Sequence, residues 1–135
     1  MANAKVSWKS GRTFIGTDST SHAVILSTKD EGIGMKPSEL LLVSLATCSS
    51  FDVVSILEKR KVILRKLDVE VTAEQDAEPP WAFNHIHMKY ILAGEGLQAK
   101  HAETAIHLSE SKYCAVAATL KGVAKITWDY VIEDQ

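Results

Sequence analysis

Hydrophobic and polar residues follow two different periods along the chain, and the changes of period predict its elements. Between residues 5 and 26, short runs of β-forming residues alternate with turn signals, which predicts an antiparallel meander of strands. A polar, glycine-containing loop at 28–34 leads to Pro37, and a proline followed by an acidic residue is typical of the first turn of a helix. The largely apolar run that follows predicts one long helix from Pro37 to Lys59.

The second half of the chain returns to alternation. Residues 67–74 and 83–92 each alternate with period two and are separated by a break at 75–80, so they predict a hairpin. Helical spacing at 97–111, a short helix ending near Gly122 and a strand at 124–132 complete the order. We therefore predict an α+β fold of one domain, residues 1–135, in which antiparallel sheets cover a long buried central helix.

Composition narrows the functional class. The chain has 135 residues, 46% of them hydrophobic and 24% charged, with a net charge of -2, which fits one ordinary soluble domain. Basic and acidic residues are interspersed, so we expect no nucleic-acid partner. The N-terminus has no apolar segment of the kind found in secretory signals, which predicts a cytoplasmic protein. The run 40–57 is long enough to suggest a membrane span, but it contains four serines and Asp52, so we expect a buried helix and no membrane partner.

The candidate chemistry lies in the two cysteines. Cys48 falls inside the long apolar helix, and Cys114 lies where a second helix could begin. A structural disulfide is not expected in a reducing cytosol, so the two thiols are either inert and buried or form a catalytic or sensing pair.

Cys48 belongs to a polar stripe on the predicted helix, because residues three, four or seven apart share a face. The stripe consists of Ser44, Cys48, Asp52, Ser55 and Lys59. In one interpretation Cys48 is only a small buried hydrophobe, and the serines donate to carbonyls of the preceding turn. In the other, Cys48 reacts as a thiolate, which burial and the carboxylate of Asp52 both disfavour unless a cation lies nearby.

Arg12 and Glu39 are the candidate assistants of Cys48. Arg12 lies in a turn from which a guanidinium could reach a site, and Glu39 at the helix start could orient it with paired hydrogen bonds. A solvated turn residue and a favourable helix-dipole charge are the alternatives. Near Cys114, free backbone N–H groups at a helix start would favour a thiolate, and Tyr113 is either core or site lining, with core preferred.

Other kinds of site are less well supported. His85 and His87 share one face of a strand and could bind a metal, but no third ligand has a recognisable spacing, so solvent-facing histidines are the preferred interpretation. No zinc motif, dinucleotide fingerprint or nucleophile elbow is present.

Two stretches resemble the OsmC/Ohr family of osmotically inducible and organic hydroperoxide resistance proteins. They are Pro37-Ser38-Glu39-Leu40-Leu41 followed by Ala46-Thr47-Cys48-Ser49, and Ser109-Glu110-Ser111-Lys112-Tyr113-Cys114-Ala115-Val116. The residues after Cys48 look closer to the general OsmC-like branch than to the hydroperoxide reductases. The resemblance covers nearly the whole chain and implies an intertwined homodimer whose sheets wrap two central helices.

The resemblance also implies roles for these residues. Cys48 would be the peroxidatic thiolate that reduces an organic hydroperoxide, and Cys114 would resolve its sulfenic acid as a disulfide, which an external dithiol reduces. Arg12 and Glu39 would assist, and neither cofactor nor metal is required. The family usually has a glutamate directly after the helix-starting proline, whereas this chain has Ser38 there. Glu39 is turned by about 100° from that position, so it need not replace that carboxylate. Peroxidase activity is the first hypothesis. A small-ligand-binding or redox-sensing protein with little turnover is the alternative, and a structural dimer with two incidental cysteines is a third.

Overall fold

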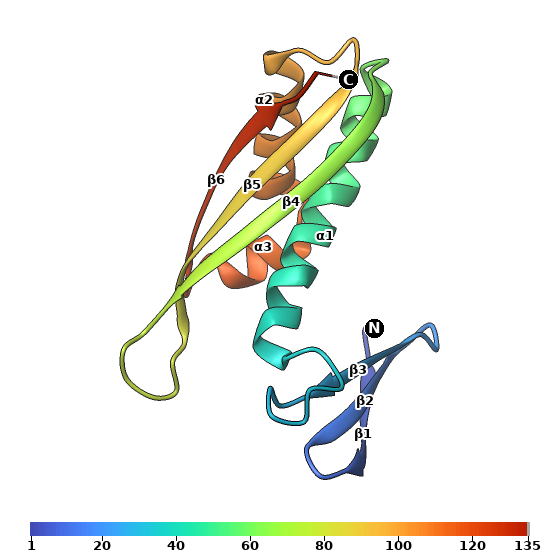
Figure 1. Cartoon of the computed structure of the whole chain (residues 1–135). Helices are drawn as coiled ribbons and strands as arrows, with labels where there is room; N and C mark the ends of the chain where they lie inside the picture. Colours follow the sequence, from blue (N-terminus) through green and yellow to red (C-terminus); the bar gives the residue numbers. More distant parts are fainter. Residues whose placement is uncertain (135) are drawn as a thin grey trace. The chain divides into compact units, whose positions relative to one another are not determined.

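The computed structural model describes residues 1–134, which form two compact units, one ending at Leu42 and the other beginning at Val43. In the first unit, β1 (Ala4–Ser10), β2 (Thr13–Asp18) and β3 (Ala23–Ser27) form an antiparallel sheet in the order β1-β2-β3 (Figure 1). This sheet is the predicted meander.

Helix α1 (Pro37–Lys59) has the predicted bounds. Proline begins it, Glu39 lies in its first turn and Lys59 in its last, which is the charge arrangement that a helix dipole favours. Its buried side chains recur every fourth residue and are Leu45, Ser49, Val53 and Leu57. One row of the helix therefore faces the core of the second unit.

The second unit is built on a three-stranded sheet. Its strands β4 (Ile63–Gln75), β5 (Phe83–Glu95) and β6 (Lys125–Ile132) lie in the order β4-β5-β6. The hairpin of β4 and β5 is antiparallel as predicted, but β5 and β6 run parallel, so the expectation of purely antiparallel sheets was wrong for β6. The reason is the connection, which crosses over through α2 (Ala99–Leu108), η1 (Ser109–Tyr113) and α3 (Ala115–Leu120).

The helices of the second unit lie on one face of this sheet (Figure 1). The alternation on β5 has the predicted sides: Ile86, Met88, Tyr90 and Leu92 are almost completely buried, whereas His85 and His87 lie on the other face. Helix α2 contributes Ala102, Ala105 and Ile106 to the same core. It ends at Leu108, earlier than predicted, because the next five residues widen into the π-helical turn η1.

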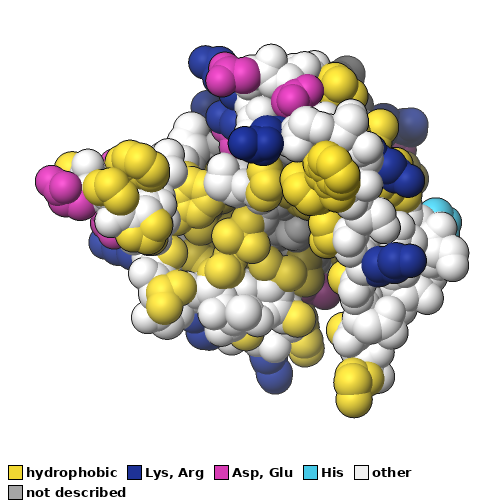
Figure 2. All heavy atoms as spheres, turned by 90° about the horizontal axis from the view of Figure 1, so that it is seen from below, with side chains coloured by type: hydrophobic (Ala, Val, Ile, Leu, Met, Phe, Trp, Pro, Cys, Tyr) yellow, Lys and Arg dark blue, Asp and Glu magenta, His cyan; other side chains and the backbone are white. Residues whose placement is uncertain are grey.

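Helix α1 is not buried on all sides within one chain. Leu41, Val43 and Phe51 are 39%, 45% and 70% exposed, and apolar side chains reach the surface elsewhere too (Figure 2). Among residues 1–134, α1 is the one helix that is long and apolar enough by length and composition to cross a membrane, a test that the core helix of a soluble protein also passes.

Candidate thiol site

Cys48 and Cys114 lie together in the second unit. Cys48 is half-buried on α1, and Cys114 is 2% exposed at the N-cap of α3. Both thiols are free, and the proximity of Cys48 is one of the causes that raise the pKa of Cys114. The fold therefore brings together two cysteines that are far apart in sequence. The β4–β5 hairpin and the first part of the crossover to β6 lie between them.

Cys114 begins a helix, as predicted. Its pKa is raised from the ordinary 9.0 to about 11, mainly by burial, and the neighbouring Cys48 contributes to that rise. The backbone N–H of Ala117 donates to Sγ at 3.3 Å and opposes this rise, but burial dominates. The N–H groups at the helix start therefore favour a thiolate, as predicted, but burial of the nearly inaccessible sulfur outweighs them.

A cluster of hydroxyl groups and one carboxylate lies beside the two thiols. Ser109 Oγ is 2.9 Å from Asp52 Oδ2 and 3.1 Å from Ser49 Oγ, and Ser49 Oγ is 2.5 Å from the hydroxyl of Tyr90. Ser49, Tyr90 and Ser109 are completely buried. Burial raises the pKa of Tyr90 to about 12, so its hydroxyl keeps its proton at neutral pH. Asp52, which seemed badly placed beside Cys48 in the sequence, is thus a hydrogen-bond acceptor for this cluster.

Ser55 of the polar stripe is satisfied locally. Ser55 Oγ donates to the carbonyl of Phe51 at 3.0 Å, and the neighbouring Ser50 Oγ donates to that of Ala46 at 2.7 Å. These back-bonds are the ones that the first interpretation predicted for serines in a helix.

Three members of the cluster were missed from the sequence: Ser49, Tyr90 and Ser109. Ser49 lies one residue outside the stripe, on the row of α1 that faces the core. Tyr90 gave a usable signal, because a tyrosine in the buried register of a strand needs a partner for its hydroxyl. Glu110 was also missed; its Oε2 is buried without a hydrogen-bond partner among residues 1–134, and burial raises its pKa.

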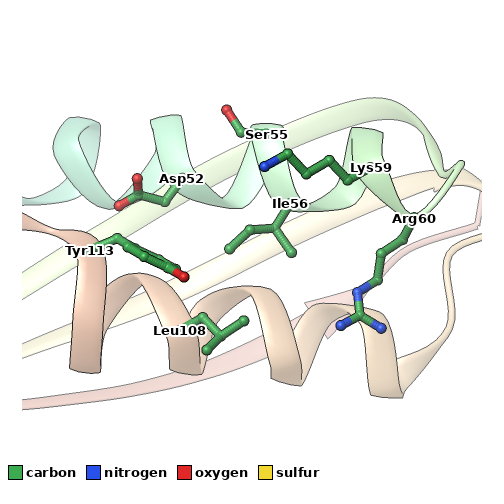
Figure 3. Close-up of a pocket in the computed structure, with 7 residues that line it drawn as sticks. All are labelled: Asp52, Ser55, Ile56, Lys59, Arg60, Leu108 and Tyr113. Carbon is green, nitrogen blue, oxygen red and sulfur yellow. The ribbon is translucent and has the colours of Figure 1, made fainter.

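A groove opens on the side of α1 that carries Asp52. It has a volume of about 630 Å³ and is lined by Asp52, Ser55, Ile56, Lys59, Arg60, Leu108 and Tyr113. Figure 3 shows the α1 side chains on one side of the groove and Leu108 and Tyr113 on the other. Tyr113 is 54% exposed, so its predicted place in the core was wrong: Cys114 turns inward and the adjacent ring turns outward.

A comparison with protein families decides the identity. The family model described as OsmC-like protein matches residues 28–129, which include both cysteines and the hydroxyl cluster. The chain belongs to the OsmC-like family. Its resemblance to this family in the sequence is thereby confirmed.

Relatives of this OsmC-like chain cover nearly its whole length. Protein YhfA of Escherichia coli K12 is 33% identical over 129 residues, which are 96% of each chain. A hypothetical protein from Aquifex aeolicus VF5 has a crystal structure with 30% identity and a TM-score of 0.85, covering 98% of each chain. The organic hydroperoxide resistance protein OhrB of Bacillus subtilis has 14% identity and a TM-score of 0.63, covering 98% of each chain, and shares the fold.

Arg12 and Glu39 belong to the first unit of this OsmC-like chain. The guanidinium of Arg12 contacts the carbonyl of Gly11 at 3.4 Å, and Glu39 pairs with Lys36 at 3.3 Å. Arg12 and Lys36 also line a cavity of about 370 Å³ with Phe14 and Leu26. Assistance to Cys48 by Arg12 and Glu39 stays a prediction.

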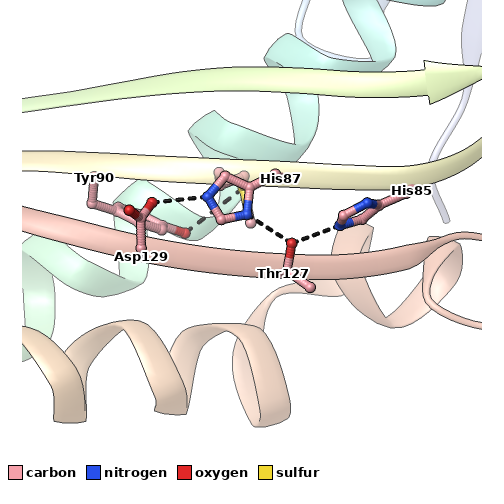
Figure 4. Close-up of polar contacts among 6 residues, drawn as sticks. His85, His87, Tyr90, Thr127 and Asp129 are labelled. Atoms are coloured by element: carbon pink, nitrogen blue, oxygen red, sulfur yellow. Dashed lines mark hydrogen bonds and ion pairs between the residues drawn. The ribbon is translucent and has the colours of Figure 1, made fainter.

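The two histidines of the OsmC-like sheet form a polar chain on its outer face. Thr127 Oγ1 lies 2.7 Å from His85 Nε2 and 2.7 Å from His87 Nδ1, and His87 Nε2 is 2.8 Å from Asp129 Oδ1 (Figure 4). Both rings are about one-third exposed. Within residues 1–134, no three histidine, cysteine or acidic side chains converge as metal ligands.

Proposed function

We propose that this chain is a cysteine-dependent peroxidase that reduces organic hydroperoxides with Cys48 and Cys114. The observation that carries the proposal is that both thiols are free and that Cys48 lies near enough to Cys114 to be one of the causes that raise the pKa of Cys114. Structural neighbours named for organic hydroperoxide resistance support the same chemistry.

The reaction has three steps. The thiolate of Cys48 attacks one oxygen of R–O–O–H; the O–O bond breaks, Cys48 becomes a sulfenic acid, and the alkoxide takes a proton to leave as an alcohol. Cys114 then attacks the sulfenic sulfur, the S–O bond breaks, and hydroxide leaves with the thiol proton as water. An external dithiol reduces the resulting disulfide by exchange.

The different environments of the thiols support the assignment of roles. Cys114 has a pKa of about 11 and is nearly inaccessible, so at neutral pH it is a protonated thiol without direct access to peroxide. Cys48 is half-buried and is the thiol that solvent can approach. A resolving cysteine must reach only the oxidised Cys48 and does not need access to the peroxide.

The proposal includes partners and location. The exposed apolar side chains of α1, Leu41, Val43 and Phe51, support a homodimer in which a second copy covers them. A small organic hydroperoxide is the substrate and a dithiol the reductant, in the cytoplasm and in defence against oxidative stress. The chemistry needs neither a metal nor a cofactor.

The test follows hydroperoxide consumption by the reduced, full-length protein with dithiothreitol as the dithiol. The wild type is expected to turn over cumene or tert-butyl hydroperoxide and Cys48→Ser to be inactive. Cys114→Ser, freed of dithiothreitol before peroxide is added, is expected to consume one equivalent and to keep a sulfenic acid on Cys48 that dimedone traps. Wild-type protein that consumes no more peroxide than Cys48→Ser would remove the proposal.

A binding protein on the same fold is the second candidate, and the groove favours it. Lys59 and Arg60 place positive charge at one end, while Ile56, Leu108 and Tyr113 supply apolar walls, which suits an amphipathic anion. The test titrates 8-anilinonaphthalene-1-sulfonate into the reduced protein and into Lys59→Gln/Arg60→Gln. Tight binding that the double variant loses, together with no peroxide turnover, would favour this candidate.

A further inference from the structure

Ser109 connects the two segments that carry the thiols. It is completely buried at the start of η1. Its hydroxyl oxygen lies 2.9 Å from Asp52 Oδ2 and 3.1 Å from the backbone carbonyl oxygen of Ser49, both on α1. Its own backbone carbonyl accepts a 2.7 Å hydrogen bond from the N–H of Cys114. One residue is therefore bonded both to the helix of Cys48 and to Cys114.

The direction of the hydrogen bonds fixes this connection. Among residues 1–134, the Asp52 carboxylate is the nearest acceptor to Ser109 Oγ and the charged one, so Ser109 donates its single hydroxyl proton to Asp52. The lone pairs of Ser109 Oγ can then accept from the Ser49 hydroxyl, whose oxygen accepts from Tyr90. Each hydroxyl proton then has an acceptor. A buried hydrogen-bond network in which every donor is satisfied holds its side chains rigidly.

The position of Cys114 follows from this anchor. From Ser109, one wide π-helical turn leads to Cys114, whose sulfur is held on its far side by the N–H of Ala117 at 3.3 Å. Turns of this width are frequent at functional sites. The sulfur has little freedom of its own, so its approach to Cys48 depends on where Ser109 holds the turn.

We propose that Ser109, anchored on Asp52, is the positioning residue of the resolving step: it holds Cys114 where its sulfur can attack the oxidised Cys48. The proposal rests on the proposed function of the two cysteines. In that step the Cys114 sulfur displaces hydroxide from Cys48–S–OH, so it must approach in line with the S–O bond. Misplacement by about 1 Å can slow a positioned reaction by roughly 100-fold.

The first experiment separates the two oxidation steps in full-length reduced protein treated with tert-butyl hydroperoxide. Sulfenic acid on Cys48 is trapped with dimedone, and the Cys48–Cys114 disulfide is followed by mass spectrometry without reduction. Ser109→Ala is expected to form sulfenic acid at the wild-type rate but to close the disulfide about 10- to 100-fold more slowly. Ser109→Thr, which keeps the hydroxyl, is expected to restore the wild-type rate of disulfide formation.

Ser111→Ala is the matched control. Ser111 lies in the same π-helical turn, but its hydroxyl donates at 2.6 Å to the carbonyl of His107 and it is exposed. It is expected to close the disulfide at the wild-type rate. The proposal would be overturned if Ser109→Ala formed the disulfide at the wild-type rate, or if Ser111→Ala slowed disulfide formation as much as Ser109→Ala does.

A second readout needs no peroxide. The equilibrium of the two thiols with reduced and oxidised dithiothreitol reports how favourably Cys114 meets Cys48. Ser109→Ala is expected to shift it about tenfold toward the dithiol form, corresponding to a potential about 30 mV higher. An unshifted equilibrium, or a wild type that forms no disulfide even with diamide, would overturn the proposal. A wild type without sulfenic acid on Cys48 would instead remove the proposed function, and the dithiothreitol equilibrium would still decide the role of Ser109.

Asp52→Asn covers the case in which Ser109→Ala does not fold. It leaves Ser109 in place but replaces its charged acceptor by a neutral amide. The same readouts then apply: slower closure and a shifted dithiothreitol equilibrium support the anchor, and wild-type values for both contradict it.

Discussion

Asp52 Oδ2 accepts a 2.9 Å hydrogen bond from the hydroxyl of Ser109, and this contact links the helix of Cys48 to the turn that leads to Cys114. The acid therefore has a structural partner at a site where its charge alone would oppose a neighbouring thiolate.

Asp52→Asn should destabilise the protein by about 1 kcal/mol. Hydrogen bonds to charged acceptors contribute roughly 1.5–3 kcal/mol and neutral ones roughly 0.5–1.5 kcal/mol, and the amide keeps the size of the side chain. Unfolding in urea measures the change. The control is Asp68→Asn, since the Asp68 carboxylate is 65% exposed and 4.0 Å from Lys66, and it should change the free energy of unfolding by less than about 0.5 kcal/mol. Equal effects of the two substitutions would contradict the anchor role of Asp52.

Tyr90→Phe should cost about 1–3 kcal/mol, because it leaves a buried Ser49 hydroxyl without the partner that lies 2.5 Å away. The ring itself is kept, so loss of packing contributes little. Tyr130→Phe removes a 2.6 Å hydrogen bond to Glu103 at the surface and should cost no more than about 0.5 kcal/mol. Thermal unfolding of both variants makes the comparison, and a Tyr90→Phe variant as stable as Tyr130→Phe would refute the importance of the buried cluster.

The sequence predicted the elements of this fold well because their patterns are local. The bounds of α1 follow from Pro37, the first-turn acid and a largely apolar run without glycine or a further proline, and the faces of β5 follow from strict alternation. The parallel pairing of β6 was not predicted, since strand direction depends on the crossover that precedes the strand and not on its own residues.

The site was predicted only in part, because it depends on contacts between segments that are distant in sequence. Cys48, Cys114 and Asp52 stood out as unusual residues in their segments, but contacts between α1 and η1 decide what each one does. Ser109 looked like an ordinary helical serine until the π-helical turn placed it against Asp52. Whether a helix start ionises Cys114 is a balance between N–H donation and burial, and the sequence contains only the first of these.

Phe51→Glu should weaken self-association. Phe51 is 70% exposed on α1, and a charged residue there would have to be desolvated in any interface that covers this face. Light scattering during gel filtration should give a dimer for the wild type and a monomer for the variant at micromolar concentration. Val123→Glu changes an apolar residue that is 80% exposed outside the helices and should leave the dimer intact. A wild type that elutes as a monomer would contradict the homodimer.

Alkaline pH should destabilise the reduced protein in the range set by Cys114 and Tyr90. Their pKa values in the folded state are raised from 9.0 to about 11 and from 10.0 to about 12, so the folded chain holds these protons longer than the unfolded chain. The stability from the protonated groups is complete below pH 9 and is lost as pH rises toward 11 and 12, with a slope of at most about 1.4 kcal/mol per pH unit for each group. The melting temperature, measured with a non-thiol reductant from pH 8 to 11, should fall more steeply for the wild type than for Cys114→Ala. Parallel curves for the two proteins would contradict the burial of a protonated thiol.

Glu110→Gln should stabilise the protein at neutral pH. Burial raises the pKa of Glu110, although Lys121 and His107 oppose the rise, and Oε2 has no hydrogen-bond partner among residues 1–134. A raised pKa means that the protonated acid is favoured by folding, so its contribution to stability is present below pH 4.5 and is lost as pH rises through the folded pKa. The neutral amide avoids that loss, and since the side chain is only half-buried the gain at pH 7 should be no more than about 1 kcal/mol. Urea unfolding should show the difference shrinking as pH falls toward 4, because the native side chain has taken up its proton by then. Glu58→Gln, at an exposed position of α1, should show neither the gain in stability nor its pH dependence. If the gain for Glu110→Gln persisted unchanged at pH 4, burial of the charge would not be its cause.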